Sequence, residues 1–131
     1  MDIRKEIPKL IARFSKRLGV PPPEWSFTIW DNFHYEHQMD EYPSDYGYPD
    51  ERWLIYIPDY YLRLYETSRL EERRISLIFS LAHEVAHHSF CVNNIDFTSV
   101  IECERACNEV AEKLTGLSWD DVDLEEKVYA G

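Results

Sequence analysis

The segment His83-Glu84-Val85-Ala86-His87 follows the pattern HExxH, in which two histidines stand four residues apart and a glutamate follows the first. Residues four apart lie on the same face of an α-helix, so both imidazoles can reach one metal ion. The carboxylate of Glu84 lies beside the first histidine, where it can take a proton from a water molecule on that metal. The pattern predicts a zinc hydrolase. The alternative is a helix surface that carries these residues for solubility.

A catalytic zinc ion needs a third protein ligand and an open position. The predicted helix after the motif offers four glutamates: Glu102, Glu104, Glu109 and Glu112. At about 100° per residue, Glu104 falls beside the apolar face, whereas Glu102 and Glu109 project to the opposite side. We therefore expect Glu104 to be the third ligand, with a solvated acid as the alternative. Asn108, one turn later, is expected to accept a hydrogen bond from a ligand imidazole.

Together, HEVAHH and the later stretch ERACNEVAEKL are similar to two motifs of the ImmA/IrrE family of small metallopeptidases. The spacing, HExxH followed after sixteen residues by Glu104 and then by Asn108, resembles the gluzincin arrangement, and the short chain resembles the minigluzincins. The resemblance extends from about Trp53 to Leu114. It implies a zincin-like α+β fold with an N-terminal helix, a small antiparallel or mixed sheet, the HExxH helix and a glutamate helix.

The resemblance also implies a role for each site residue. His83, His87 and Glu104 are the expected ligands of a Zn²⁺ ion, Glu84 the general base, and Asn108 the residue that orients a ligand. The expected activity is that of a zinc-dependent peptidase that cleaves a specific protein with metal-activated water. A DNA-binding transcriptional repressor is the expected substrate. Two alternatives stay open: a metal-containing regulator that binds a protein without cleaving it, and a latent enzyme blocked by its C-terminal tail.

Gluzincins also use a side chain that stabilises the oxyanion, and the sequence leaves that residue open. The candidates are three tyrosines near the second predicted strand and two histidines in the acidic segment before it: Tyr56, Tyr60, Tyr61, His34 and His37. His88 points about 100° away from His87, so we interpret it as a hydrogen-bonded or surface histidine. The cysteines Cys91, Cys103 and Cys107 are interpreted as reduced core residues rather than metal ligands.

The chain has 131 residues, which is enough for one domain over 1–131. Its 25 acidic residues outnumber the 14 basic ones, and a net charge of −11 is the opposite of what a nucleic-acid binder carries. Residues 31–51 and 91–131 carry −7 each, and the second block includes an acidic tail over 116–131. We therefore expect a basic or neutral protein or peptide partner. Because no apolar run approaches about 18 residues and the N-terminus does not resemble a signal peptide, we expect a cytoplasmic protein that does not enter a membrane.

Five regular elements are expected to position the motif. Apolar periodicity predicts helices and alternation of aromatic and β-branched residues predicts strands. The predicted helices cover 3–18, 69–90 and 100–115, and the predicted strands cover 25–30 and 53–57.

The segments between these elements are less regular. Residues 31–51 hold Pro and Gly without a clear period, which indicates a long loop or a loose hairpin, and 59–65 fits a short helix or turn. Two capping boxes, which begin at Ser68 and Ser99, are expected to start the second and third helices, and Gly116 to end the third.

Overall fold

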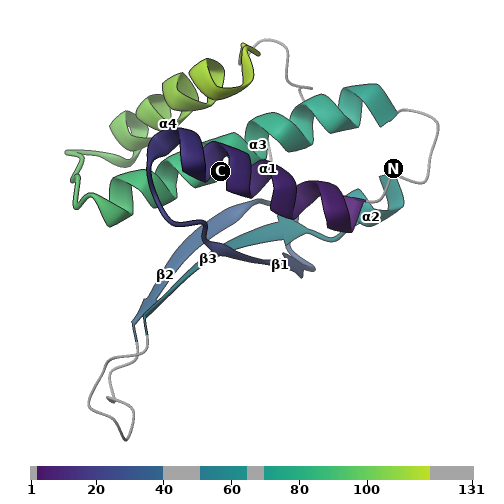
Figure 1. Ribbon diagram of the computed structural model, residues 1–131, viewed down its shortest axis with the longest axis horizontal. Coiled ribbons are helices and arrows are strands. Elements are labelled where there is room, and N and C mark those ends of the chain that lie inside the picture. Colours follow the sequence, from purple (N-terminus) through teal and green to yellow (C-terminus); the bar gives the residue numbers. More distant parts are fainter. Residues whose placement is uncertain (1–2, 40–50, 65–69, 119–131) are drawn as a thin grey trace, which may run out of the picture.

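The computed structural model describes residues 3–39, 51–64 and 70–118. Over these ranges the chain is an α+β protein, as expected, with four helices and a three-stranded mixed sheet. In Figure 1, α1 and α3 form a layer over one face of the sheet, and α4 packs against α3. The elements are α1 (Ile3–Leu18), β1 (Glu24–Thr28), β2 (His34–Met39), β3 (Glu51–Pro58), α2 (Tyr60–Leu64), α3 (Leu70–Val92) and α4 (Val100–Thr115).

The core lies between the helix layer and the sheet. Apolar residues of α1 recur at helical spacing and pack against α3, while alternate residues of β3 point at both helices. The side chains that fill this space are fully or almost fully buried: Ile7, Ile11, Phe14, Ile55, Ile57, Leu77, Leu81 and Val85. Burial of eight such side chains fixes the position of α3, which carries the HExxH motif.

The sheet has the strand order β1-β3-β2. β1 runs parallel to β3, and β2 runs antiparallel to it, so that Ile55 lies between Trp25 on one side and Tyr35 on the other. Among the described residues β2 pairs with β3 alone, which makes it an edge strand. The outer edge of β2 therefore presents backbone N–H and C=O groups to an added strand.

The bounds of two predicted strands need correction, since β1 covers Glu24–Thr28 rather than 25–30 and β3 covers Glu51–Pro58 rather than 53–57. The last bond of the β1 ladder runs from the N–H of Asp59 to the carbonyl oxygen of Thr28 at 2.8 Å, and because α2 begins at Tyr60, no strand residue is left to pair with residues 29 and 30. Ile29 and Trp30 are consequently exposed. For residues 31–51 the structure supports the hairpin rather than the loop, since 34–39 pairs with 51–56.

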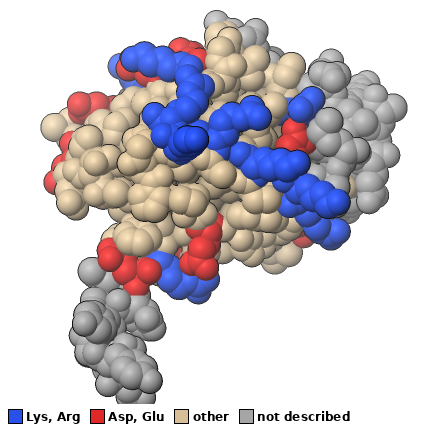
Figure 2. All heavy atoms as spheres, in the orientation of Figure 1, with Lys and Arg blue, Asp and Glu red and all other residues tan. Residues whose placement is uncertain are grey.

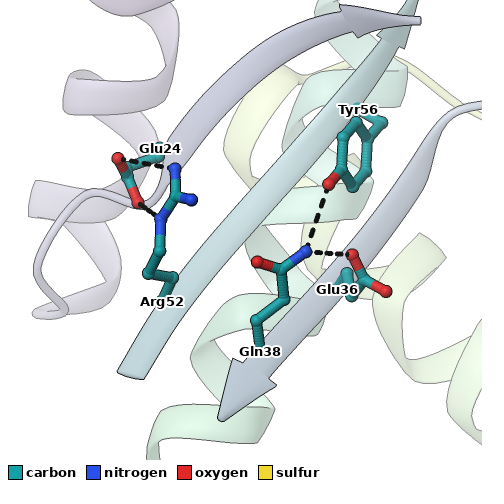
Figure 3. Close-up of polar contacts among 5 residues, drawn as sticks. All are labelled: Glu24, Glu36, Gln38, Arg52 and Tyr56. Atoms are coloured by element: carbon teal, nitrogen blue, oxygen red, sulfur yellow. Dashed lines mark hydrogen bonds and ion pairs between the residues drawn. The ribbon is translucent and has the colours of Figure 1, made fainter. Parts of the chain in front are cut away.

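A polar network covers the face of the sheet that points away from the helices (Figure 3). Arg52 donates hydrogen bonds to both oxygens of Glu24 at 2.9 and 3.3 Å, which ties β3 to β1. Gln38 donates to Glu36 at 2.7 Å and to the hydroxyl of Tyr56 at 3.3 Å, which ties β2 to β3. The edge strand is thus held by side chains as well as by its ladder.

The ends of α4 follow the predicted capping. Ser99 is the N-cap, and its hydroxyl accepts a hydrogen bond from the backbone N–H of Glu102 at 3.1 Å. The Glu102 carboxylate accepts a hydrogen bond from the Thr98 hydroxyl, so only the Ser99 half of the predicted capping box is observed. Gly116 adopts φ 72° and closes the C-terminus, as its position predicts. The other predicted capping box, at Ser68, and the tail beyond residue 118 lie outside the described residues.

The helix predictions are otherwise close to the observed bounds. α1 matches residues 3–18, α4 matches 100–115, and α3 extends two residues beyond the predicted end at 90. Among the helices that the structure describes, none has the length and apolar character needed to cross a membrane.

Candidate metal centre

The helices α3 and α4 form an antiparallel pair that brings the predicted ligands together. The short connection 93–99 turns the chain back, so that His83 lies opposite Asn108 and His87 lies opposite Cys103 and Glu104. His83 and His87 share one face of α3 because they are one turn apart. The site is therefore built from two rigid helices rather than from loops.

Three donor groups converge between the helices. Nε2 of His83 lies 2.8 Å from Oε2 of Glu104, and Nε2 of His87 lies 3.2 Å from Oε1 of the same carboxylate. The two Nε2 atoms are 3.2 Å apart. Donor atoms on a tetrahedral zinc ion, with bonds of about 2.0–2.1 Å, are about 3.3 Å apart. These three residues therefore fit a single ion, and Glu104 occupies the position that the sequence predicts for it.

The outer nitrogen of each imidazole also has a partner. Nδ1 of His83 donates a hydrogen bond to Oδ1 of Asn108 at 2.8 Å, as predicted, and Nδ1 of His87 lies 3.7 Å from the sulfur of Cys103. A proton on Nδ1 leaves Nε2 of a neutral ring with a lone pair directed at Glu104. Lone pairs that converge in this way are stable only around a proton or a cation.

The charges at the site agree with this arrangement. Hydrogen bonds from His83 and His87 lower the pKa of Glu104 to about 2, so this carboxylate is an anion at neutral pH. Burial alone lowers the pKa of His83, but the hydrogen bond to Glu104 and the charges of Glu84 and Glu104 outweigh it and raise that pKa. A divalent cation would replace the protons that the two imidazoles otherwise share with Glu104.

Cys107 is a further donor that the sequence analysis set aside as a core residue. It is fully buried, but its sulfur forms with His83 and His87 a group whose ligand atoms lie within 4.8 Å of one another and could hold a metal ion. Burial raises the pKa of this thiol, which disfavours the thiolate that binds metals. Glu104 lies 2.8 and 3.2 Å from the two Nε2 atoms and is already ionised, so we regard it as the better third ligand.

Glu84 lies next to these donors and is 2% exposed. Burial raises the pKa of Glu84 to about 7, against the opposing effect of His83 and His87. A carboxyl group with this pKa can accept and release a proton at neutral pH. Its predicted role as a proton acceptor is consistent with this environment.

A cleft of about 550 Å³ opens onto the donors. Its walls come from the turn after β1, from β2, and from the two helices. The lining residues are Trp30, Asn32, Phe33, His34, Tyr35, Glu84, His87 and Glu104. The edge strand β2 therefore borders the metal centre directly.

Of the five oxyanion candidates, His34 lines the cleft. His37 instead contacts Glu51 at 2.7 Å, Tyr56 accepts a hydrogen bond on the outer face of the sheet, and Tyr61 is buried in the core beside Tyr60. The ring of His34, however, stacks on that of Tyr56 on the outer face, with the centroids 6.1 Å apart, so the geometry selects none of the five as the oxyanion residue.

Tyr35 is a site residue that the sequence analysis missed. Its ring stacks on His87 with the planes 6° apart, and its hydroxyl contacts Nδ1 of His88 at 2.8 Å. Nε2 of His88 lies 2.7 Å from the carbonyl oxygen of Pro21, which only accepts, so Nε2 carries the proton and Nδ1 accepts from Tyr35. His88 is 1% exposed, which confirms the hydrogen-bonded interpretation over the surface one. Alternation along 34–39 could have indicated Tyr35 if the strand had been recognised.

Comparison of the chain with protein-family models, with curated proteins and with solved structures finds no match. The case for a function therefore depends on the geometry of the site and on the motifs that form it.

Proposed function

We propose that the protein is a zinc-dependent peptidase, with His83, His87 and Glu104 as the metal ligands and Glu84 as the proton acceptor. The observation that carries the proposal is the Glu104 carboxylate between two imidazole nitrogens, at 2.8 and 3.2 Å, on the wall of an open cleft. A zinc ion held there would lower the pKa of a water molecule and polarise a carbonyl group.

The chain's own residues supply the remaining steps. Glu84, with a pKa near 7, accepts the proton from the attacking water and delivers it to the leaving amine. Asn108 holds His83 in the tautomer that leaves Nε2 available. Tyr35 and His88 fix the wall of the cleft against His87.

An extended peptide is the substrate that the cleft fits best. β2 lines the cleft and has an outer edge unpaired among the described residues, so a peptide can add to it by main-chain hydrogen bonds. Glu84 and Glu104 give the cleft acidic walls, which favour a basic or neutral peptide. The resemblance to the ImmA/IrrE family implies a DNA-binding repressor as the substrate, and such a protein would offer the basic segments that this cleft favours.

Cys107 favours a second candidate function. A site with four protein ligands has no open position and serves structure rather than catalysis. If Cys107 joined His83, His87 and Glu104 on the ion, the protein would be a metal-containing regulator that binds its partner without cleaving it. The acidic tail predicted to block a latent enzyme lies outside the described residues.

The Glu84→Gln variant separates these functions. We expect the purified wild type to hold one zinc per chain and to cleave members of a peptide library, and Glu84→Gln to keep the metal and lose cleavage by about 10²–10⁴-fold. Glu109→Gln, an exposed acid on α4, is the matched control and should keep both properties. Metal retained by all three proteins without any cleavage would favour the regulator. A wild type that takes up no zinc would contradict both functions.

A further inference from the structure

A row of cations runs along α1 on the side of the molecule shown in Figure 2. Lys5, Lys9, Arg13 and Arg17 follow one another at every fourth residue, so they lie on one side of the helix. They line a groove of about 610 Å³, together with Arg74 from α3, which forms an ion pair at 2.8 Å with Glu6, the one acid among the described lining residues. This basic groove is unusual in a chain with a net charge of −11.

The floor of the basic groove is apolar. Leu10 and Phe14 of α1, Ile78 of α3 and Leu114 of α4 contribute to it. The groove shares no lining residue with the cleft at the metal centre. A ligand for it needs carboxylates on one side and apolar side chains on the other.

Residues 119–131 of the same chain have this chemistry in their sequence. They contain five acidic residues, Asp120, Asp121, Asp123, Glu125 and Glu126, against one lysine, Lys127. Over 121–125 the carboxylates alternate with Val122 and Leu124. In an extended peptide this alternation puts the acids on one side and the apolar residues on the other.

The distances also allow the contact. Thr115 lines the basic groove, and Trp119 follows only four residues later, within about 13 Å for an extended chain. Residues 119–126 would span about 26 Å if extended. The row of cations from Lys5 to Arg17 spans about 18 Å at 1.5 Å per residue, and the acids from 120 to 126 span about 20 Å if extended, so the two lengths are similar.

We propose that the acidic segment 119–131 binds the basic groove along α1, with its carboxylates on Lys5, Lys9 and Arg13 and its apolar residues on Leu10 and Phe14. The tether decides between this segment and an acidic partner protein, because a short covalent connection gives an effective concentration in the millimolar range. Single exposed ion pairs are weak, so the contact depends on several pairs acting together. In this arrangement the tail lies against α1 and leaves the metal centre open.

Zero-length cross-linking of the full chain tests the proposal. A carbodiimide joins a lysine amine directly to a carboxylate that touches it, and mass spectrometry identifies the joined residues. We expect Lys5 and Lys9 to join acids of 120–126 in a single chain, and Lys16, exposed on α1 but outside the groove, to join them far less. The yield should fall steeply at 1 M salt, where the Debye length is about 3 Å.

Charge reversal provides the matched comparison. Arg13→Glu should lower the yield of the Lys5 and Lys9 cross-links by about threefold or more, whereas Arg105→Glu, on an exposed part of α4, should not change it. Equal yields at Lys16 and Lys9, or no cross-link to 120–126 at all, would overturn the proposal. In a mixture of light and isotopically heavy chains, a cross-link between two molecules joins a light peptide to a heavy one. Such mixed products would mean that the groove binds the acidic segment of a second copy, which would also overturn the proposal.

Discussion

Oδ1 of Asn108 lies 2.8 Å from Nδ1 of His83, on the side of the imidazole away from Glu104. The amide oxygen accepts the Nδ1 proton and so fixes both the tautomer and the ring orientation of His83. The three residues lie on two helices that are separated by one short connection. The relationship links the packing of α3 on α4 to the chemistry of the metal centre.

Loss of the Asn108 side chain should weaken metal binding. In Asn108→Ala the buried Nδ1–H of His83 has no acceptor, and the ring is free to rotate, so we expect zinc affinity to fall by about 10–100-fold. Competition with a metallochromic chelator measures this affinity. Asn108→Asp keeps an acceptor oxygen and should retain most of it. Equal affinities for wild type and Asn108→Ala would contradict the role that we assign to the amide.

The identity of the third ligand can be tested with two variants. Glu104→Gln removes the anion that lies 2.8 and 3.2 Å from the imidazoles, and we expect a larger loss of zinc affinity than in Asn108→Ala. Cys107→Ala removes a buried thiol, and we expect little change in affinity and a loss of about 1 kcal/mol in the free energy of unfolding. The same titration, together with urea unfolding, measures both. A larger loss of zinc affinity in Cys107→Ala than in Glu104→Gln would make Cys107 the third ligand.

The helices and their ligands could be predicted because the signals are local. HExxH, the i to i+4 geometry and the capping at Ser99 and Gly116 depend on residues within a few positions of one another. Glu104 followed from its angular position on one helix. The structure brings His83, His87 and Glu104 together, as these predictions require, and their role as metal ligands stays a prediction.

The edge strand could not be assigned from its sequence with the same certainty. β2 reads HYEHQM, in which polar residues occupy both faces, so apolar alternation is hidden. Its inward residues contact other polar rings: Tyr35 meets His87 and His88, and His37 stacks on Trp53. The role of Tyr35 depends on α3, which lies about fifty residues later in the chain, and a local pattern does not contain that information.

Tyr35→Phe tests the hydrogen bond that Tyr35 donates to His88. The ring still stacks on His87, but Nδ1 of the buried His88 loses its donor, so we expect the free energy of unfolding to fall by about 1–3 kcal/mol. Urea unfolding measures the change. Tyr56→Phe removes a hydroxyl that accepts from Gln38 on the outer face of the sheet and should cost less. Equal losses in the two variants would mean that the buried hydrogen bond between Tyr35 and His88 stabilises the protein no more than the one on the outer face of the sheet.

Removal of the metal should destabilise the helix pair. A ligand that binds only the folded chain stabilises it by about 2.7 kcal/mol when its free concentration is 100 times Kd. We therefore expect dialysis against a chelator to lower the Tm of the wild type and added zinc to restore it. His83→Ala lacks one of the donors, so its Tm should not respond to either treatment. A wild-type Tm that is the same with chelator and with zinc would mean that the convergent donors do not hold an ion in solution.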